Sequence, residues 1–163
     1  MTIAQRLADL GITLPAVAVP AAAYVPFVRT GNLVFVSGHI AKQDGKAWVG
    51  QLGLTMTTAE GQQAARAVAI DLMGTLQAAA GDLTNIKRIV KVLSLVNSTP
   101  TFTEHHLVTN GCSELLVQVF GAEVGGIHGN GEPVKLSALR GLPMAAADAR
   151  VVARLIQVPP EDR

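Results

Sequence analysis

The sequence predicts an α+β fold in which one mixed β-sheet carries two helices on the same face, with a short extra helix at the amino terminus. The main observation is the stretch Ile86 to Val96, IKRIVKVLSLV, in which five of the eleven residues are β-branched. This composition favours a strand over the alternative, an isolated buried helix. Apolar residues at helical spacing stand on both sides of this strand, so two helices would pack on one sheet.

A second observation is the order of the predicted elements, which is strand pair, third strand, helix, strand, helix, strand, strand. Two crossover helices on one side of a sheet leave its other face bare. The chain is also more apolar than most soluble monomers, with 49% hydrophobic and 15% charged residues. We therefore expect another copy of the chain to cover the bare face.

The length of 163 residues is typical of one domain, so we expect a single domain spanning residues 1–163. No apolar run approaches the ~20 residues of a membrane-spanning helix, and the amino terminus lacks the layout of a signal peptide. We therefore expect a cytoplasmic protein with no membrane partner. A net charge of +1 and 4% aromatic residues make nucleic acid an unlikely main partner.

The amino-terminal segment predicts a short accessory helix followed by an extended stretch. Thr2 can cap a helix that runs through Asp9, and Gly11 stands where a C-cap glycine belongs. Residues Leu14 to Pro26 include three prolines. Because proline lacks an amide hydrogen, this stretch is not helical, and any strand in it lies at a sheet edge.

Two antiparallel strands are predicted next, from Phe27 to Arg29 and from Leu33 to Ser37, joined by a glycine-containing connection of hairpin length. A third strand or extended loop covers His39 to Val49 and is broken at Asp44-Gly45.

Both long helices are predicted from a capping box and an apolar stripe. The first box is Thr57 to Glu60, and its helix ends at Gly81; the second is Thr101 to Glu104, and its helix ends before Gly121. The only cysteine, Cys112, excludes an internal disulfide and is expected to be a core residue of the second helix.

Three further strand features are predicted from the pattern. In Ile86 to Val96, strict alternation places Ile89 with Lys91, Leu93 and Leu95, and places Val90 with Val92, Ser94 and Val96 on the other face. The last two strands are expected at Val134 to Leu139 and at Arg150 to Val158, with an alanine run before the final one.

The chain resembles the YjgF/RidA superfamily, also called endoribonuclease L-PSP or reactive-intermediate deaminase. The likeness covers about Ile3 to His128 and is closest to a longer, uncharacterised branch. It rests on the segments RLADLGITLP, AAYVPFVRTGNLVFVSG, AAGDLTNIKRIVKVLSLVNSTPTFTEHH and TNGCSELLVQVFG. The resemblance implies a chorismate-mutase-like (RidA-like) fold and a homotrimer, whose three sheets close a central barrel with ligand clefts between neighbouring subunits.

The same resemblance implies a set of cleft residues. Tyr24 matches the family tyrosine, Ser37 and Gly38 match a Ser-Gly strand end, and Asn110 matches an asparagine of the second helix. In the deaminating members, an arginine holds the substrate carboxylate and a glutamate positions water. The resemblance thus assigns Tyr24 and Asn110 to substrate orientation, and the backbone at Ser37 and Gly38 to a carbonyl or water.

The chain departs from the family after His128, where it reads GNGEPVKLSALRGLP. Lys135 falls near the place of the family arginine, and Ala153 falls at the place of the glutamate. An ammonium anchors a carboxylate less specifically than a guanidinium, and alanine transfers no proton. Arg140 and Arg154 remain alternatives to Lys135. The departure from the family after His128 has two possible origins, a genuine divergence of this chain and an irregularity of the reading frame.

The sequence leaves three function classes open. The first is binding of a small-molecule metabolite with a carboxylate or carbonyl group, with hydrolysis of enamine or imine intermediates as the activity. The second is a structural or regulatory trimer without turnover, and the third is an endoribonuclease.

No cofactor and no metal are expected. His105 and His106 are adjacent and would point about 100° apart on a helix. His39 and His128 could join one of them, but solvated or core histidines are the preferred interpretation. Lys87, Arg88 and Lys91 form a small basic cluster that we expect to be solvated.

Overall fold

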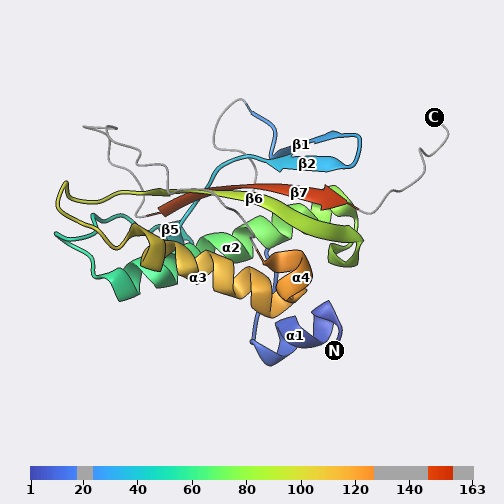
Figure 1. Ribbon diagram of the computed structural model, residues 1–163, viewed down its shortest axis with the longest axis horizontal. Helices are drawn as coiled ribbons and strands as arrows, with labels where there is room; N and C mark the ends of the chain where they lie inside the picture. The colour runs from blue at the N-terminus through green and yellow to red at the C-terminus, as the bar shows by residue number, and fades with distance from the viewer. Residues whose placement is uncertain (18–23, 127–146, 156–163) are drawn as a thin grey trace.

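The structure is a computed structural model, and it describes residues 1–17, 24–126 and 147–155 (Figure 1). Its helices and strands in chain order are α1 (Ile3–Asp9), β1 (Phe27–Thr30), β2 (Leu33–Val36), β3 (His39–Ile40), β4 (Lys42–Gln43), β5 (Lys46–Ala47), α2 (Thr58–Ala80), a 3₁₀ turn (Leu83–Asn85), β6 (Ile86–Val96), α3 (His105–Phe120), α4 (Ala122–Gly125) and β7 (Ala147–Leu155).

Strand β7 lies at the centre of the main sheet. It pairs with β2 and β3 along one edge and with β6 along the other, and β1 extends the sheet beyond β2. The described pairs of this sheet are all antiparallel. Strands β4 and β5 form a separate hairpin whose turn is Asp44-Gly45, as the sequence predicts, with positive φ at both residues.

The final strand begins earlier than the sequence pattern predicts. The expected range was Arg150 to Val158, whereas β7 already begins at Ala147. Ala147 and Asp148 pair with Val96 and Leu95 of β6, so the end of the alanine run belongs to the ladder. The low strand propensity of alanine is outweighed here by pairing on both edges. Residues 156–158 and the expected strand Val134 to Leu139 lie outside the described residues.

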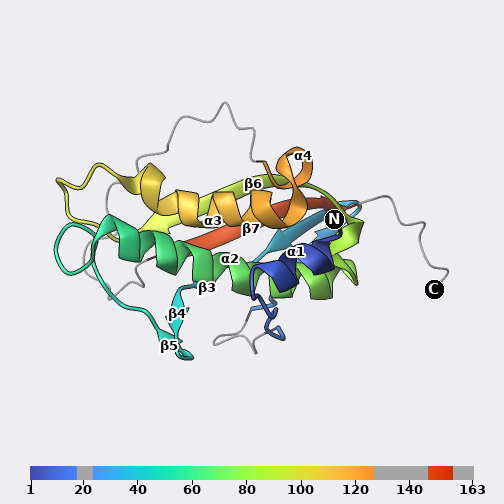
Figure 2. The ribbon, with the colours of Figure 1, turned by 90° about the horizontal axis from the view of Figure 1, so that it is seen from below.

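Helices α2 and α3 lie side by side on one face of the sheet (Figure 2). The core lies between these helices and the sheet. It includes Leu72 and Met73 of α2, Leu116 of α3 and Val34 of β2, which have no exposed surface. The two helices approach closely at Gly111, where a Cβ atom would lie 2.0 Å from the carbonyl oxygen of Gln62. The α+β class with two helices on one face is thus confirmed.

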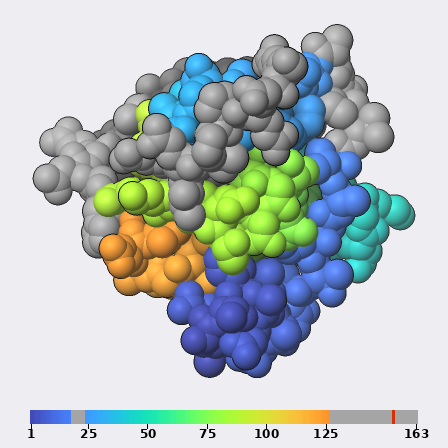
Figure 3. Space-filling model, turned by 90° about the vertical axis from the view of Figure 1, so that its right-hand side faces the viewer, coloured from blue at the N-terminus to red at the C-terminus, as the bar shows by residue number. Residues whose placement is uncertain are grey.

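The predicted accessory helix is also confirmed, with Thr2 as its N-cap and Gly11 at φ 65° just beyond its end. Helix α1 packs against the carboxyl end of α3, where Arg6 Nη1 donates a hydrogen bond of 3.0 Å to the Val119 carbonyl. A cation at this place satisfies a carbonyl that the helix leaves free and interacts favourably with the helix dipole. In Figure 3 the dark blue surface of α1 adjoins the orange surface of α3 and α4.

The predicted faces of β6 are wrong in one respect. The pairing of β6 with β7 shifts twice, between Ile86 and Arg88 and between Ile89 and Lys91. Because such a β-bulge changes the alternation, Ile89 shares the helix-covered face with Val92 and Val96, and not with Lys91. The expected extent of the strand, Ile86 to Val96, is confirmed.

The second predicted capping box is wrong as well. Helix α3 begins at His105 and not behind Thr101, and no side chain caps its first turn. The carboxylate of Glu104 instead accepts a hydrogen bond from the Thr58 hydroxyl at the start of α2. A contact between the two helices thus replaces the local cap that the sequence suggests. The first box, Thr57 with Glu60, is confirmed.

The sheet face opposite the helices, called here the open face, carries exposed apolar side chains. Val28 and Phe35 are cross-strand partners on it and are 54% and 43% exposed. Val90, at the second bulge of β6, is 48% exposed. No described helix covers this face (Figure 1). Within the described ranges, no helix is long and apolar enough to cross a membrane.

The capping box of α2 predicts a pH-dependent stability. The Thr57 amide donates to Glu60 Oε2 at 2.7 Å and the Thr57 hydroxyl donates to the same oxygen at 2.8 Å, which together lower the pKa of Glu60. A carboxyl with a lowered folded pKa stabilises the fold above its ordinary pKa of 4.5, and this contribution is lost as the pH falls through the folded value.

We expect Thr57→Ala to lower the free energy of unfolding by about 1 kcal/mol at pH 7, measured by urea denaturation. The difference from the parent protein should shrink as the pH falls below 4.5, because a protonated Glu60 accepts these bonds more weakly than the carboxylate does. Thr101→Ala is the matched control and should change little, since Thr101 caps no helix. An equal loss in both variants would contradict the assignment of the cap.

Candidate functional site

The predicted cleft residues Tyr24 and Ser37 come together at the break between β2 and β3. The Ser37 hydroxyl donates a hydrogen bond of 2.6 Å to the Val25 carbonyl, and the Ser37 amide donates one of 2.9 Å to the Pro26 carbonyl. These two bonds hold the segment before β1 against the end of β2. Tyr24, the residue before Val25, is 48% exposed, so its ring is available to a ligand or a neighbouring subunit.

His39 fixes the same strand end from the other side, a role that the sequence does not reveal. Its Nδ1 lies 2.9 Å from the Ser37 carbonyl oxygen and its Nε2 lies 2.9 Å from Thr75 Oγ1. Since a carbonyl only accepts, Nδ1 carries the hydrogen, and in the neutral ring Nε2 accepts from the Thr75 hydroxyl. Thr75 is 1% exposed and lies in the carboxyl-terminal half of α2. Gly38 therefore sits between two residues that are tied to the core.

The hydrogen bonds of the His39 ring make this residue an unlikely metal ligand. Both nitrogens of His39 already have protein partners, and His105 Nε2 lies 2.9 Å from the Ser98 hydroxyl. In the part of the chain that the structure describes, no group of three or more His, Cys, Asp or Glu residues could hold a metal ion.

The predicted site residue Asn110 comes from a different element, helix α3. Asn110 is half-buried on α3, and no hydrogen bond among the described residues joins it to Tyr24, Ser37 or Gly38. Lys135 and Arg140 lie outside the described residues.

Ala153, which the resemblance equates with the family glutamate, lies in the core. It has no exposed surface and pairs with Val34 of β2 and Ile89 of β6, both of which are buried. An ionised carboxylate at this position would lose its hydration among apolar side chains. The described chain thus offers no acid-base group at this point of β7.

Cys112 is a core residue, as the sequence predicts. It is 2% exposed on the sheet-facing side of α3, and burial raises the pKa of its thiol to about 12. The thiol is therefore protonated at neutral pH and is a poor nucleophile.

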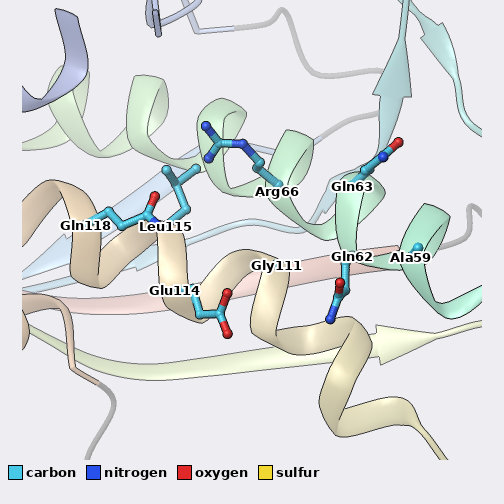
Figure 4. A pocket seen from close by; sticks show the side chains of 8 residues that line it. All are labelled: Ala59, Gln62, Gln63, Arg66, Gly111, Glu114, Leu115 and Gln118. Carbon is cyan, nitrogen blue, oxygen red and sulfur yellow. The ribbon is translucent and has the colours of Figure 1, made fainter. Parts of the chain in front are cut away.

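A hollow lies between α2 and α3, on the helix side of the molecule, and has a volume of about 400 Å³. Figure 4 shows its lining, which is mainly polar and includes Arg66 of α2 and Glu114 of α3. No described ion pair joins these two side chains. The sequence pattern gives no sign of this hollow, because its lining residues come from two separate helices and include Gly111, where these helices approach closely.

Comparisons with known proteins agree with the fold and with the resemblance. The family described as "YjgF/chorismate_mutase-like, putative endoribonuclease" matches residues 4–131. The "Protein TCP17" of Trypanosoma cruzi is 50% identical over 124 residues, which are 76% of this chain and 78% of that protein.

Two solved structures are similar over nearly the whole chain. The protein Atu1372 of Agrobacterium tumefaciens, described as of unknown function, has a TM-score of 0.80 and 35% identity, covering 95% of this chain and 94% of that one. A "putative endoribonuclease" of Shewanella oneidensis MR-1 has a TM-score of 0.80 and 27% identity, covering 95% and 100%. With its α+β architecture and the family match over most of its length, the chain belongs to the YjgF/chorismate mutase-like family.

Proposed function

We propose that this protein is a homotrimer that binds a small metabolite carrying a carboxylate or carbonyl group in the clefts between neighbouring subunits. Tyr24 and Asn110 orient the ligand, and the backbone at Ser37 and Gly38 contacts its carbonyl or a water molecule. Lys135 holds the carboxylate. The proposal joins residues from two neighbouring subunits, as the resemblance to the family implies.

The observation that carries the proposal is the rigid strand end at Ser37-Gly38. The Val25 carbonyl, the Ser37 hydroxyl, the Ser37 carbonyl, His39 and buried Thr75 form one continuous chain of hydrogen bonds from the exposed segment at Tyr24 to the core of α2. A site held in this way is preorganised, so little ordering is needed when a ligand binds. Its position beside exposed apolar side chains fits a cleft that closes when subunits meet.

The open face supports the trimer. Val28, Phe35 and Val90 expose large apolar surface on the sheet face opposite the helices. Contiguous apolar surface of this kind in a folded protein usually marks an interaction site. A homo-oligomer with closed symmetry covers the same face of every chain at once.

The reaction class proposed for the cleft is hydrolysis of an imine or enamine, in which water replaces nitrogen at the reactive carbon and ammonia leaves. The buried position of Ala153 removes the family glutamate from this chain's chemistry. Turnover would then depend on positioning by Ser37 and Gly38 and on the charge of Lys135. General acid-base help from a positioned side chain is typically worth ~100-fold or more, so we expect a slow enzyme.

An endoribonuclease is the second candidate, because the matched family and one similar structure carry that word in their descriptions. The exposed cations Lys87, Arg88 and Lys91 could contact phosphates. Gel filtration tests it: cleavage of RNA must follow the protein peak fraction by fraction, and cleavage that elutes elsewhere excludes this function.

The proposed assembly predicts a specific mass. Light scattering in dilute neutral buffer should give three times the mass of one chain, and Phe35→Asp should lower this mass because it places a carboxylate on the apolar open face. Gln63→Asp, at an exposed position of helix α2, is the matched control and should leave the mass unchanged. A folded parent protein with the mass of one chain would refute the assembly.

The proposed cleft predicts ligand binding and ammonia release. Keto acids or hydroxy acids at millimolar concentration should raise the melting temperature, and the protein should speed ammonia release from a freshly generated 2-imino acid. Lys135→Ala should weaken ligand binding about tenfold and slow ammonia release about tenfold, because it removes the charge that holds the carboxylate. The rise in melting temperature should therefore be smaller in this variant. Lys46→Ala, on the separate β4–β5 hairpin, should retain both ligand binding and ammonia release.

If no acid of the panel shifts the melting temperature and the ammonia rate equals that in buffer, the metabolite proposal is wrong. A shift without any rate would leave a binding protein and exclude the hydrolysis.

A further inference from the structure

We propose that Arg88 and Lys91 form a binding site for a small multivalent oxyanion on the open face, at the end of β6 that begins with Ile86. The inference rests on the proposed trimer only for the covering of this face; the site itself is built from one chain. It is separate from the cleft at Tyr24 and Ser37, and neither cation takes part in that cleft.

The two bulges of β6 place both cations on the open face. Arg88 is the cross-strand partner of Arg154, next to the buried pair Ile89 and Ala153, so it belongs to the opposite face. Lys91 is the partner of Val152, which also pairs with Phe35. Without the second bulge, Lys91 would share the face of Ile89 and enter the core.

Bulges interrupt the ladder and are common next to functional sites, where they redirect a side chain. Two bulges within six residues of β6 therefore indicate a functional role for this end of the strand. The result is that Lys91 stands in the same row as the exposed side chains of Phe35 and Val28. Arg88 stands in the neighbouring row.

These cations have no carboxylate partner in the described part of the chain, where the single ion pair is Lys42 with Asp71. Both Arg88 and Lys91 are exposed to water in the single chain.

Covering the open face changes the electrostatics of this place. When apolar neighbours such as Phe35 and Val90 are covered, the nearby cations lose water, and unpaired cations in such surroundings are costly. An anion with several oxygens restores the lost interactions and can accept a bidentate bond from the guanidinium of Arg88. Two cations on one chain favour a multivalent anion over a monovalent one.

The test is calorimetric titration of the full chain with pyrophosphate and, separately, with citrate, in 50 mM and in 300 mM sodium chloride. Binding of pyrophosphate would indicate a phosphate ligand, and binding of citrate would indicate a polycarboxylate. Binding of either anion supports the site. Arg88→Gln and Lys91→Gln should each weaken binding about tenfold, and the higher salt should weaken it further. Lys46→Gln is the matched control, with the same charge change on the β4–β5 hairpin.

Three results would overturn the proposal: no binding of either anion at 5 mM in the lower salt, an equal loss of binding in Lys46→Gln, or tighter binding of a single-stranded oligonucleotide than of both small anions. Light scattering on the same samples separates this site from the trimer. A mass of one chain with intact anion binding would refute the assembly and keep the site, whereas a trimer without anion binding would refute the site alone.

Discussion

The pairing of β7 between β2 and β6 is the interaction on which the rest of this structure depends. Strand β7 joins strands that come from the first hundred residues, so the described sheet is complete only when this distant strand is paired. Buried Ala153 lies at the crossing point, between Val34 and Ile89 and beneath α2. A charged group at this position would lose its hydration among apolar side chains.

The one-sided covering of the sheet follows from the connections. Helices α2 and α3 pack on the same face and contact each other closely at Gly111. The opposite face keeps Val28 and Phe35 exposed. Two features thus explain the apolar composition of the chain. One is a core that is buried within one chain, and the other is a sheet face whose apolar side chains remain exposed in one chain.

The described site combines a rigid part and an exposed part. His39 and Thr75 tie the end of β2 to the core, and Ser37 ties the Tyr24 segment to that end. Sequence comparison by itself points to Tyr24, Ser37 and Gly38, because they are part of a recognisable motif. It does not point to His39, whose partner Thr75 is 36 residues away on a helix and is adjacent only in the folded chain.

The sequence alone determined the element types, because local signals carry them: the helical spacing and the Thr57 capping box specify α2, and β-branched residues specify β6. It also indicated a bare sheet face. Only the tertiary structure decided where α3 begins, where β7 begins and which face each residue of β6 occupies. These features depend on contacts between distant segments, namely Thr58 with Glu104 and the shifted ladder between β6 and β7, and no local pattern encodes such contacts.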